Sequence, residues 1–399
     1  MLYIKPDYFY KFKCTADKCE ATCCAGWQIV IDEESLARYR KEQSAYGEVL
    51  RERVNWEEGV FKQDVCKRCA FLNPDNLCDM YRHLGMESLC VTCTNYPRHI
   101  EEFENIREIT LTISCPEAAR IILGQTEPVK FEEEEIESEE EEFEDFDPFF
   151  FSYLEDGRKI ALGILQNRAW SISVRYALLK KFADEIQDII QNAELYELSD
   201  VFEKYEDEGF LTNAVHNIQK EVTAFHTNAS DAFRYSKTMF GKLYELEHLS
   251  EEWEPHLEQC WKVLYSGIAT AYQDIHEAFR VWAGQFAGEG PKFAADGPLE
   301  RQEQAVIENQ PDYSLDILLE QLLVYFVFTY FCGAVYDGNV LGKVNMALVS
   351  VYNLYEMLVA KWTEQGRRLE RKDIERIVYQ YSRELEHSDE NLERMEKMY

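Results

Sequence analysis

The sequence predicts a mainly α protein, with a small irregular cysteine-rich domain followed by a larger all-α helical domain. Ten of the twelve cysteines fall within the first 115 of its 399 residues. An acidic run follows, and beyond Pro148 apolar residues recur at helical spacing. We therefore expect a cysteine-rich, metal-binding domain at 1–130, an acidic linker at 131–148 and a helical domain at 149–399.

The clustered cysteines are expected to bind metal. A disulfide framework of this density would need an oxidising compartment. The segment Met1–Asp7 has neither a positively charged leader nor a continuous apolar stretch, so no signal peptide is predicted and the expected location is cytoplasmic. Thiols stay reduced in the cytoplasm, where clustered cysteines usually bind zinc or iron as thiolates.

The residues around the thiols favour an iron–sulfur cluster over a single zinc ion. Two C-x2-C pairs have the spacing of a four-thiolate zinc site. The thiols are too many for one tetrahedral site, however, and the adjacent Cys23 and Cys24 do not readily face one ion. The apolar shell that a cluster needs is supplied by Trp27, Phe71, Leu72 and Tyr96. His83 and His99 are weaker candidates as ligands because so many thiols are present.

The charge of the chain excludes some classes of partner. Its formal charge is −33, with 75 acidic and 42 basic residues, and such a surface repels phosphate backbones and anionic membranes. We expect no nucleic acid and no membrane as partners. The charge favours basic substrates such as a lysine side chain, or simply keeps the protein soluble.

The acidic run from Glu132 to Glu142 is interpreted as the linker that closes the cysteine-rich domain. Like charges at this density repel one another and bury almost nothing, so the segment should be extended or mobile. An acidic arm that engages lysine-rich protein is the alternative.

Two apolar stripes define the helical domain. One contains Leu178, Leu179, Phe182, Ile186, Ile189 and Ile190, and the other Leu315, Leu318, Leu319, Leu322, Phe326 and Tyr330. The uninterrupted apolar run Leu322–Phe328 is shorter than the roughly 20 residues of a membrane span, so it predicts a buried helix. A loop is expected at Gly288–Pro298, and Cys260 and Cys332 should be core residues. Length suggests about seven or eight helices in this domain.

Several segments together resemble the flagellin lysine-N-methylase family. These are Phe12–Cys14, Cys19–Trp27, Cys69–Leu72, Leu77–Cys78, Leu89–Cys93, Asn95–Arg98 and Ser114–Arg120. The resemblance is strong across the cysteine-rich domain and weaker at Ile164–Arg168 and Leu322–Asp337 of the helical domain. Broader relatives that share the cysteine pattern are described only as zinc- or iron-chelating proteins, so the pattern identifies the metal domain better than the activity.

The resemblance implies an enzyme that transfers a methyl group from S-adenosylmethionine to lysine ε-amines of flagellin and carries a [4Fe-4S] cluster. The metal ligands that it implies are Cys14, Cys19, Cys23, Cys24, Cys69, Cys78, Cys90, Cys93 and Cys115. Cys66 is an addition in this chain. Two clusters, or one cluster and one zinc ion, remain open.

Polar residues near these motifs are candidates for the substrate pocket. Tyr96 and Glu117 are candidate catalytic groups, because a hydroxyl can orient an amine and a carboxylate can accept its proton. Arg98, Asn167 and Arg168 are candidates for binding the methyl donor, whose carboxylate suits a guanidinium. Each also has a structural explanation, as a turn, an ion pair or a helix-start charge.

The sequence contains no glycine-rich strand–turn–helix element, so a Rossmann-type methyltransferase is not predicted. The cysteine spacing is also not the C-x3-C-x2-C run of radical S-adenosylmethionine chemistry. The cluster could be structural, a redox switch or a donor-binding group, and the structural role is favoured. The alternative function is a non-catalytic metal-binding module that docks a protein partner, and donor binding distinguishes the two.

Overall fold

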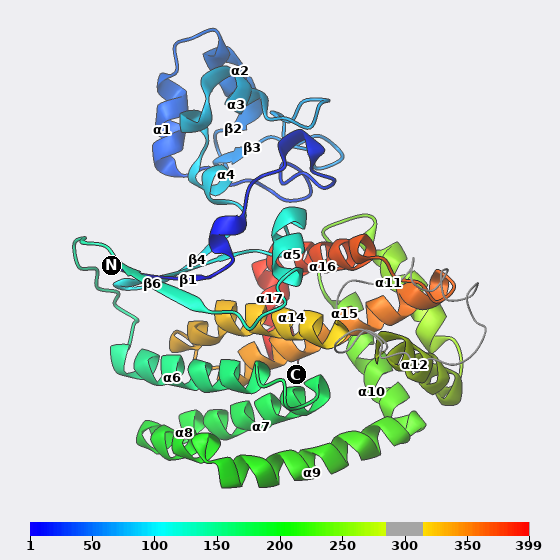
Figure 1. The fold of residues 1–399 in the computed structure, drawn as a ribbon. Helices are drawn as coiled ribbons and strands as arrows, with labels where there is room; N and C mark the ends of the chain where they lie inside the picture. Colours follow the sequence, from blue (N-terminus) through cyan, green and yellow to red (C-terminus); the bar gives the residue numbers. More distant parts are fainter. Residues whose placement is uncertain (285–313, 399) are drawn as a thin grey trace, which may run out of the picture.

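The computed structural model describes residues 1–284 and 314–398. The fold is mainly α, as predicted, with a small cysteine-rich lobe above a sheet and a large helical body below it (Figure 1). The loop predicted at Gly288–Pro298 lies outside the described residues.

The cysteine-rich lobe is built from short elements around a small core. These are α1 (Glu33–Lys41), α2 (Tyr46–Arg53), β2 (Val54–Asn55), β3 (Val60–Phe61), α3 (Asp79–Leu84) and α4 (Val91–Asn95). Asp32 joins two of them, because one carboxylate oxygen accepts from the Ser35 amide at the start of α1 and the other from the Val91 amide at the start of α4. Helices this short are not stable alone, so the lobe depends on such contacts and on its core.

A four-stranded sheet in the order β4-β5-β1-β6 lies between part of the lobe and the helices (Figure 1). Its strands are β1 (Leu2–Pro6), β4 (Arg98–Phe103), β5 (Ile106–Leu111) and β6 (Phe131–Glu135), and α5 (Pro116–Leu123) follows β5. Strand β1 is parallel to β5 and antiparallel to β6, and Leu2 pairs with Glu135 in the register.

The prediction that 131–148 is entirely a linker is wrong in its first part, because β6 is an edge strand of the sheet. The glutamates of β6 are exposed, and Glu134 pairs with Lys5 of β1 at 3.1 Å. An edge strand keeps one side in solvent, so its charges need not be desolvated. The backbone bonds to β1 therefore outweigh the repulsion expected from the charge pattern.

The boundary expected at 130 also differs from the packing. Phe103, Leu111, Ile121 and Val129, which belong to the sheet and α5 region, share one hydrophobic core with the helical body. The separate core of the cysteine-rich lobe extends only from Ile29 to Cys90. The lobe is thus an insertion between β1 and β4 rather than the whole of 1–130.

The helical body has eleven α-helices in its described part, more than the seven or eight expected. They are α6 (Pro148–Leu165), α7 (Ile172–Gln191), α8 (Leu198–Glu206), α9 (Glu208–Thr227), α10 (Ala229–Gly241), α11 (Trp253–Tyr265), α12 (Ala269–Gly284), α14 (Leu315–Tyr330), α15 (Val340–Glu364), α16 (Arg371–Glu386) and α17 (Asp389–Lys397). The estimate failed because several helices, such as α8 and α17, are short.

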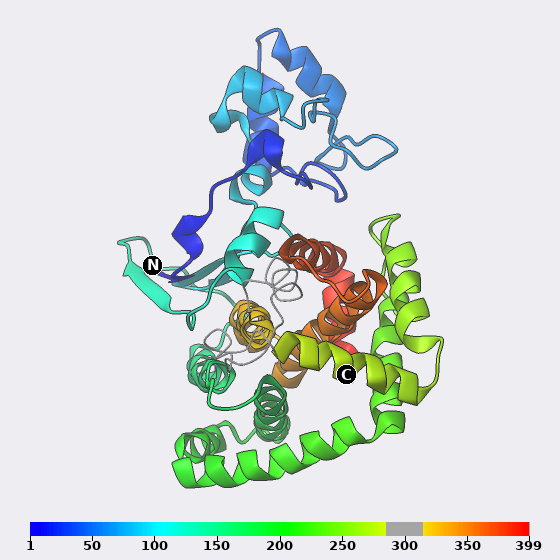
Figure 2. The ribbon, with the colours of Figure 1, turned by 45° about the vertical axis from the view of Figure 1, so that its right-hand side comes forward.

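Helix α14 lies between the sheet and the rest of the helical body (Figure 2), and it packs against α5, α6, α7 and α15. Every residue from Leu318 to Thr329 is buried. The segment Leu315–Val335 is long and apolar enough to cross a membrane, but 89% of its apolar window is buried inside the protein. It is a core helix, as predicted. The stripe of α7 is also confirmed, since Leu178, Phe182 and Ile186 are buried.

Candidate functional site

The predicted cysteine ligands form two sets. The adjacent residues Cys23 and Cys24 belong to different sets. The first set comprises Cys14, Cys19, Cys23 and Cys115. Burial raises the pKa of Cys115 to about 11, and the neighbouring Cys19 and Cys14 raise it further. A hydrogen bond with Cys24 and burial raise the pKa of Cys23, as do Cys14 and Cys115. These thiols are therefore close enough to interact electrostatically.

The second set lies within and against the core of the lobe. It comprises Cys24, Cys69, Cys78, Cys90 and Cys93. The Cys69 amide donates to the Cys24 carbonyl at 2.8 Å, and burial raises the pKa of Cys69 to about 12, with further contributions from Cys24, Cys78 and Cys90. A hydrogen bond from Cys93 lowers the pKa of Cys90. Cys66 is exposed in a turn of the lobe.

Three of these cysteines precede the first residue of a helix. Cys78, Cys90 and Cys115 are the N-cap residues of α3, α4 and α5. The positive end of a helix favours the thiolate form, which is the form that binds metal. At Cys78 and Cys115 burial outweighs this effect and raises the pKa of the thiol.

The two sets fit iron–sulfur clusters in ligand type and number. A cluster takes four thiolates in an apolar shell, and each set supplies at least four thiols. The indole nitrogen of Trp27 donates to the Cys23 carbonyl at 2.8 Å, and its ring lies 5.0 Å from His387 and 5.9 Å from Tyr96. Within the described residues, no three His, Cys, Asp or Glu side chains form a closed group that could hold one metal ion.

Helix α16 fixes the first thiol set against the helical body. The Arg383 guanidinium donates to the Ser114 carbonyl at 2.9 Å and to the Ala21 carbonyl at 2.7 Å. These carbonyls lie next to Cys115 and close to Cys23 in the chain. His387 Nε2 lies 3.0 Å from Ser114 Oγ, and burial lowers the pKa of His387 to about 3, so this imidazole is neutral.

A second contact of α16 predicts a pH dependence of stability. Glu384 accepts from the amides of Leu249 and Ser250, and burial raises its pKa from 4.5 to about 7. Between these values the folded chain binds more protons at this site than the unfolded chain does. This site therefore makes the free energy of unfolding fall as pH rises from about 4.5 to 7, by up to about 1.4 kcal/mol per pH unit.

Denaturant unfolding of the wild type and Glu384→Gln at pH 5 to 8 measures this effect. The variant should lose this part of the pH dependence, whereas Glu390→Gln, at an exposed residue of α17, should keep it. Parallel pH profiles for Glu384→Gln and the wild type would contradict the assignment.

The predicted residues near the lobe have separate surroundings. Tyr96 donates to or accepts from Ser114 Oγ at 3.1 Å, and burial raises its pKa. Glu117 forms an ion pair with Arg120 at 2.6 Å in the first turns of α5. The Arg98 guanidinium lies over the rings of Phe9 and Phe12. Tyr96 thus lies beside the first thiol set. Glu117 lies in the first turn of α5, which was its structural alternative. Arg98 packs on aromatic rings instead of forming the ion pair that was its alternative.

Arg168 is a structural residue in this fold. It pairs with Glu320 at 2.8 Å, and Arg175 pairs with the same carboxylate at 2.6 Å. Asn167 accepts the Ala169 amide within the turn after α6. Glu320 is fully buried in α14. The Arg168 guanidinium is therefore already engaged by a protein carboxylate, so it is a poor candidate for binding a donor carboxylate.

The two candidate histidine ligands also have other partners. His83 Nδ1 lies 2.8 Å from the Asp79 carbonyl, and its ring stacks on Tyr46. His99 Nε2 lies 2.5 Å from a Glu101 oxygen.

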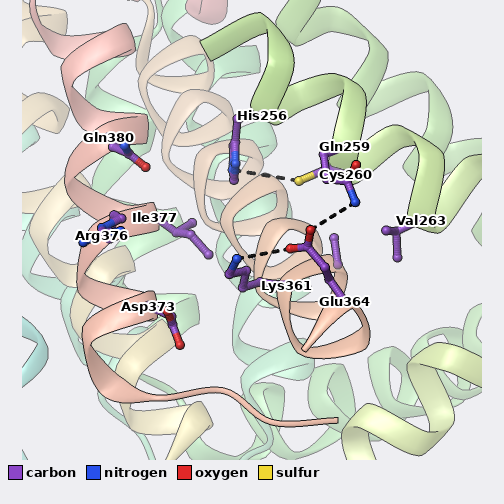
Figure 3. A pocket seen from close by; sticks show the side chains of 11 residues that line it. His256, Gln259, Cys260, Val263, Lys361, Glu364, Asp373, Arg376, Ile377 and Gln380 are labelled. Atoms are coloured by element: carbon purple, nitrogen blue, oxygen red, sulfur yellow. Dashed lines mark hydrogen bonds and ion pairs between the residues drawn. The ribbon is translucent and has the colours of Figure 1, made fainter. Parts of the chain in front are cut away.

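Cys260 and Cys332 are core residues, as predicted, with 3% and 1% of their surface exposed. Cys260 Sγ lies 3.9 Å from His256 Nε2 (Figure 3). The cavity beside Cys260 and His256 has a volume of about 110 Å³, and the ion pair of Lys361 and Glu364 lines it. It has room for a few water molecules and not for a nucleoside.

A much larger cavity of about 560 Å³ lies among α7, α9, α10, α12, α14 and α15. We call it the aromatic cavity, after its lining residues Tyr176, Phe225, Tyr235, Tyr272, Tyr352 and Tyr355. Three of these rings meet edge to face, since Tyr235 lies 5.6 Å from Phe225 and 5.5 Å from Tyr352. Such cavities, apolar with a few polar groups, are typical of small-molecule sites.

A buried carboxylate forms the polar end of the aromatic cavity. Glu356 of α15 is fully buried and accepts from the hydroxyls of Tyr265 and Tyr272, each at 3.0 Å. His276 Nε2 lies 2.9 Å from the same carboxylate, and its Nδ1 lies 3.0 Å from the Tyr272 carbonyl. Sequence reasoning did not find this group, because aromatic residues at helical spacing are usually core.

Residues 158–399 match the family described as the FliB lysine N-methylase C-terminal domain. The chain belongs to the FliB lysine N-methylase family. The family match covers more than half of the chain and includes the whole aromatic cavity, whereas the cysteines of the lobe lie outside it.

Among curated relatives, this member of the FliB family is 26% identical over 140 residues to the Lysine-N-methylase of Salmonella typhimurium. That match covers 33% of this chain and 35% of the relative. The Flagellar biosynthetic protein FliU of Salmonella muenchen is 27% identical over 128 residues, covering 30% of this chain and 76% of the relative. The chain thus aligns with about a third of the lysine-N-methylase. No solved structure matches.

Proposed function

We propose that this protein is a lysine N-methylase that transfers methyl groups from S-adenosylmethionine to lysines of flagellin. The observation that carries the proposal is the family match over the helical body, which encloses the aromatic cavity. The names of the relatives supply the reaction and the flagellar context. The expected location is the cytoplasm.

Methyl transfer to lysine is a polar displacement. The neutral ε-amine attacks the methyl carbon and forms an N–C bond, while the C–S bond breaks and its electron pair stays on sulfur. The products are S-adenosylhomocysteine and a methylammonium, which then releases a proton. The protein must deprotonate the amine, exclude water and align the two reactants.

The two thiol sets would supply the thiolate ligands for [4Fe-4S] binding, with Cys23 in the first set and Cys24 in the second. When bound, a cluster would link chain segments that have little core of their own. The Arg383 contacts to Ser114 and Ala21 would keep the first set docked on the helical body. We assign the cluster a structural role.

The proposal predicts methylation of flagellin by the full chain. Anaerobically purified protein incubated with S-adenosylmethionine should add increments of about 14 Da to flagellin, one CH2 each, without a reductant. The rate should rise with pH, because only the neutral amine attacks and lysine is normally protonated at neutral pH. Intact-mass spectrometry measures both results.

Two outcomes would contradict the proposal. An absolute requirement for an electron donor would contradict the polar mechanism. No methylation combined with no binding of S-adenosylmethionine would contradict the enzyme and favour a non-catalytic metal-binding module that docks a protein partner.

A further inference from the structure

The volume of the aromatic cavity indicates the size of ligand that it can bind. Its volume of about 560 Å³ lies within the range of about 300–1,000 Å³ for small-molecule sites. A lysine side chain, with four methylenes and one amine, would leave most of this space empty. A nucleoside-sized molecule matches the volume better, and the apolar lining from Ile172, Leu319 and Leu323 suits a ligand with a large apolar part.

The aromatic lining favours a cation. Faces of tyrosine and phenylalanine rings attract sulfonium and alkylammonium groups, and the attraction is strongest where water is excluded. Glu221 and Asp316 add two carboxylates to the lining, against the guanidinium of Arg280. His226 adds no positive charge at neutral pH, because burial and Arg280 lower its pKa.

His276 and two tyrosines contact the buried carboxylate at the end of the cavity. A carbonyl only accepts, so the Nδ1 that faces the Tyr272 carbonyl carries a proton. The Nε2 of His276 and the hydroxyls of Tyr265 and Tyr272 all lie within hydrogen-bonding distance of the Glu356 carboxylate. The Tyr272 hydroxyl donates to this carboxylate, which makes its ring more electron-rich and a better partner for a cation.

Arg280 supplies a group for an anionic end of the ligand. It is exposed beside the cavity, and one of its nitrogens lies 3.1 Å from His226 Nδ1. A guanidinium has five N–H donors and binds a carboxylate with two parallel hydrogen bonds. The cavity thus has two parts. Its aromatic rings, with the Glu356 carboxylate behind them, suit a cation, and the Arg280 guanidinium suits a carboxylate of the ligand.

We propose that the aromatic cavity is the binding site of the methyl donor, S-adenosylmethionine, with its sulfonium against the aromatic rings and its carboxylate at Arg280. This inference rests on the proposed methylase function. It assigns the donor to the helical body, away from the thiol sets.

Donor titration of the full chain tests the proposal. Arg280→Met removes a surface charge, and Tyr235→Leu removes one aromatic wall. Each should raise the dissociation constant for S-adenosylmethionine about tenfold, the effect of about 1.4 kcal/mol. Arg234→Met is the matched control, because Arg234 is an exposed arginine beside Tyr235 that does not line the cavity. It should bind the donor like the wild type.

S-adenosylhomocysteine separates the role of the cation from that of shape, because it lacks the methyl group and the positive charge. The wild type should bind it more weakly than the donor, and Tyr235→Leu should reduce this preference. If the wild type binds the donor and methylates flagellin, but Arg280→Met and Tyr235→Leu bind like Arg234→Met, the donor site is elsewhere and the inference is wrong. A wild type that neither binds donor nor methylates contradicts the proposed function itself.

Discussion

Cys23→Ser is expected to lower the iron content and the thermal stability of the protein together. Cys23 belongs to the first thiol set, and metal-binding free energy in such a lobe is also folding free energy. A loss of a few kcal/mol, at roughly 4–8 °C per kcal/mol for a domain of about 100 residues, should lower the melting temperature of the lobe by about 10 °C or more. Iron analysis and calorimetry of anaerobic protein measure both effects.

Cys24→Ser should have a comparable effect through the second set, although it lies one residue away. If each set binds its own cluster, each variant should retain about half of the iron and acid-labile sulfide. Cys66→Ser is the control, because Cys66 is exposed and belongs to neither set. Equal losses in Cys66→Ser and Cys23→Ser would show that the ligands are assigned wrongly.

Glu108→Ala is expected to lower the free energy of unfolding by about 3–5 kcal/mol. Both oxygens of Glu108 on β5 accept from the Arg158 guanidinium on α6, and both side chains are buried. The variant leaves this cation buried, with the Phe328 carbonyl at 3.1 Å and the Phe328 ring as its nearby partners. Removing one partner of a buried pair costs more than the pair itself contributes, since a charge remains without compensation.

Denaturant unfolding measures this loss against Asp156→Ala, which breaks the exposed pair of Asp156 and Lys159 on the same helix. Such exposed pairs contribute about 0–1 kcal/mol. The double variant with Glu108→Leu and Arg158→Met should recover much of the loss, because no buried charge remains. An effect of Glu108→Ala no larger than that of Asp156→Ala would contradict the buried-pair account.

The helical part of the fold was predictable because it is encoded locally. The spacing of Leu178, Phe182 and Ile186 predicts one buried face of α7, and the structure buries that face. The strand at 131–135 was not predictable in the same way. It forms by pairing with Leu2–Pro6, about 130 residues away, and its four glutamates show no alternation of apolar and polar residues.

The candidate site was predictable only where residues of one chemical type lie close together in the sequence. Cysteine clustering predicts thiolate ligands, but spacing does not show that Cys23 and Cys24 belong to different sets, which depends on the tertiary packing of Cys69 and Cys115. Arg168 was predicted as a donor ligand because a guanidinium suits a carboxylate. The local sequence does not show that a protein carboxylate, Glu320, binds it from 152 residues away.

The aromatic cavity was missed for a related reason. Tyr272 and His276 lie one turn apart on α12, and Tyr352, Tyr355 and Glu356 lie on one turn of α15. Glu356 is the one charged residue between Lys343 and Lys361 of α15, and it is the signal that could have identified the site, since a buried carboxylate requires several partners. Its partners come from helices far away in the sequence.

We expect the cysteine-rich lobe to bind iron and sulfide as a cluster docked on the helical body. The most direct measurement is iron, zinc and acid-labile sulfide analysis, with a visible spectrum, of the full chain purified without air. We expect brown protein with broad thiolate-to-iron absorption and sulfide matching its iron. Stoichiometric zinc without sulfide would contradict it.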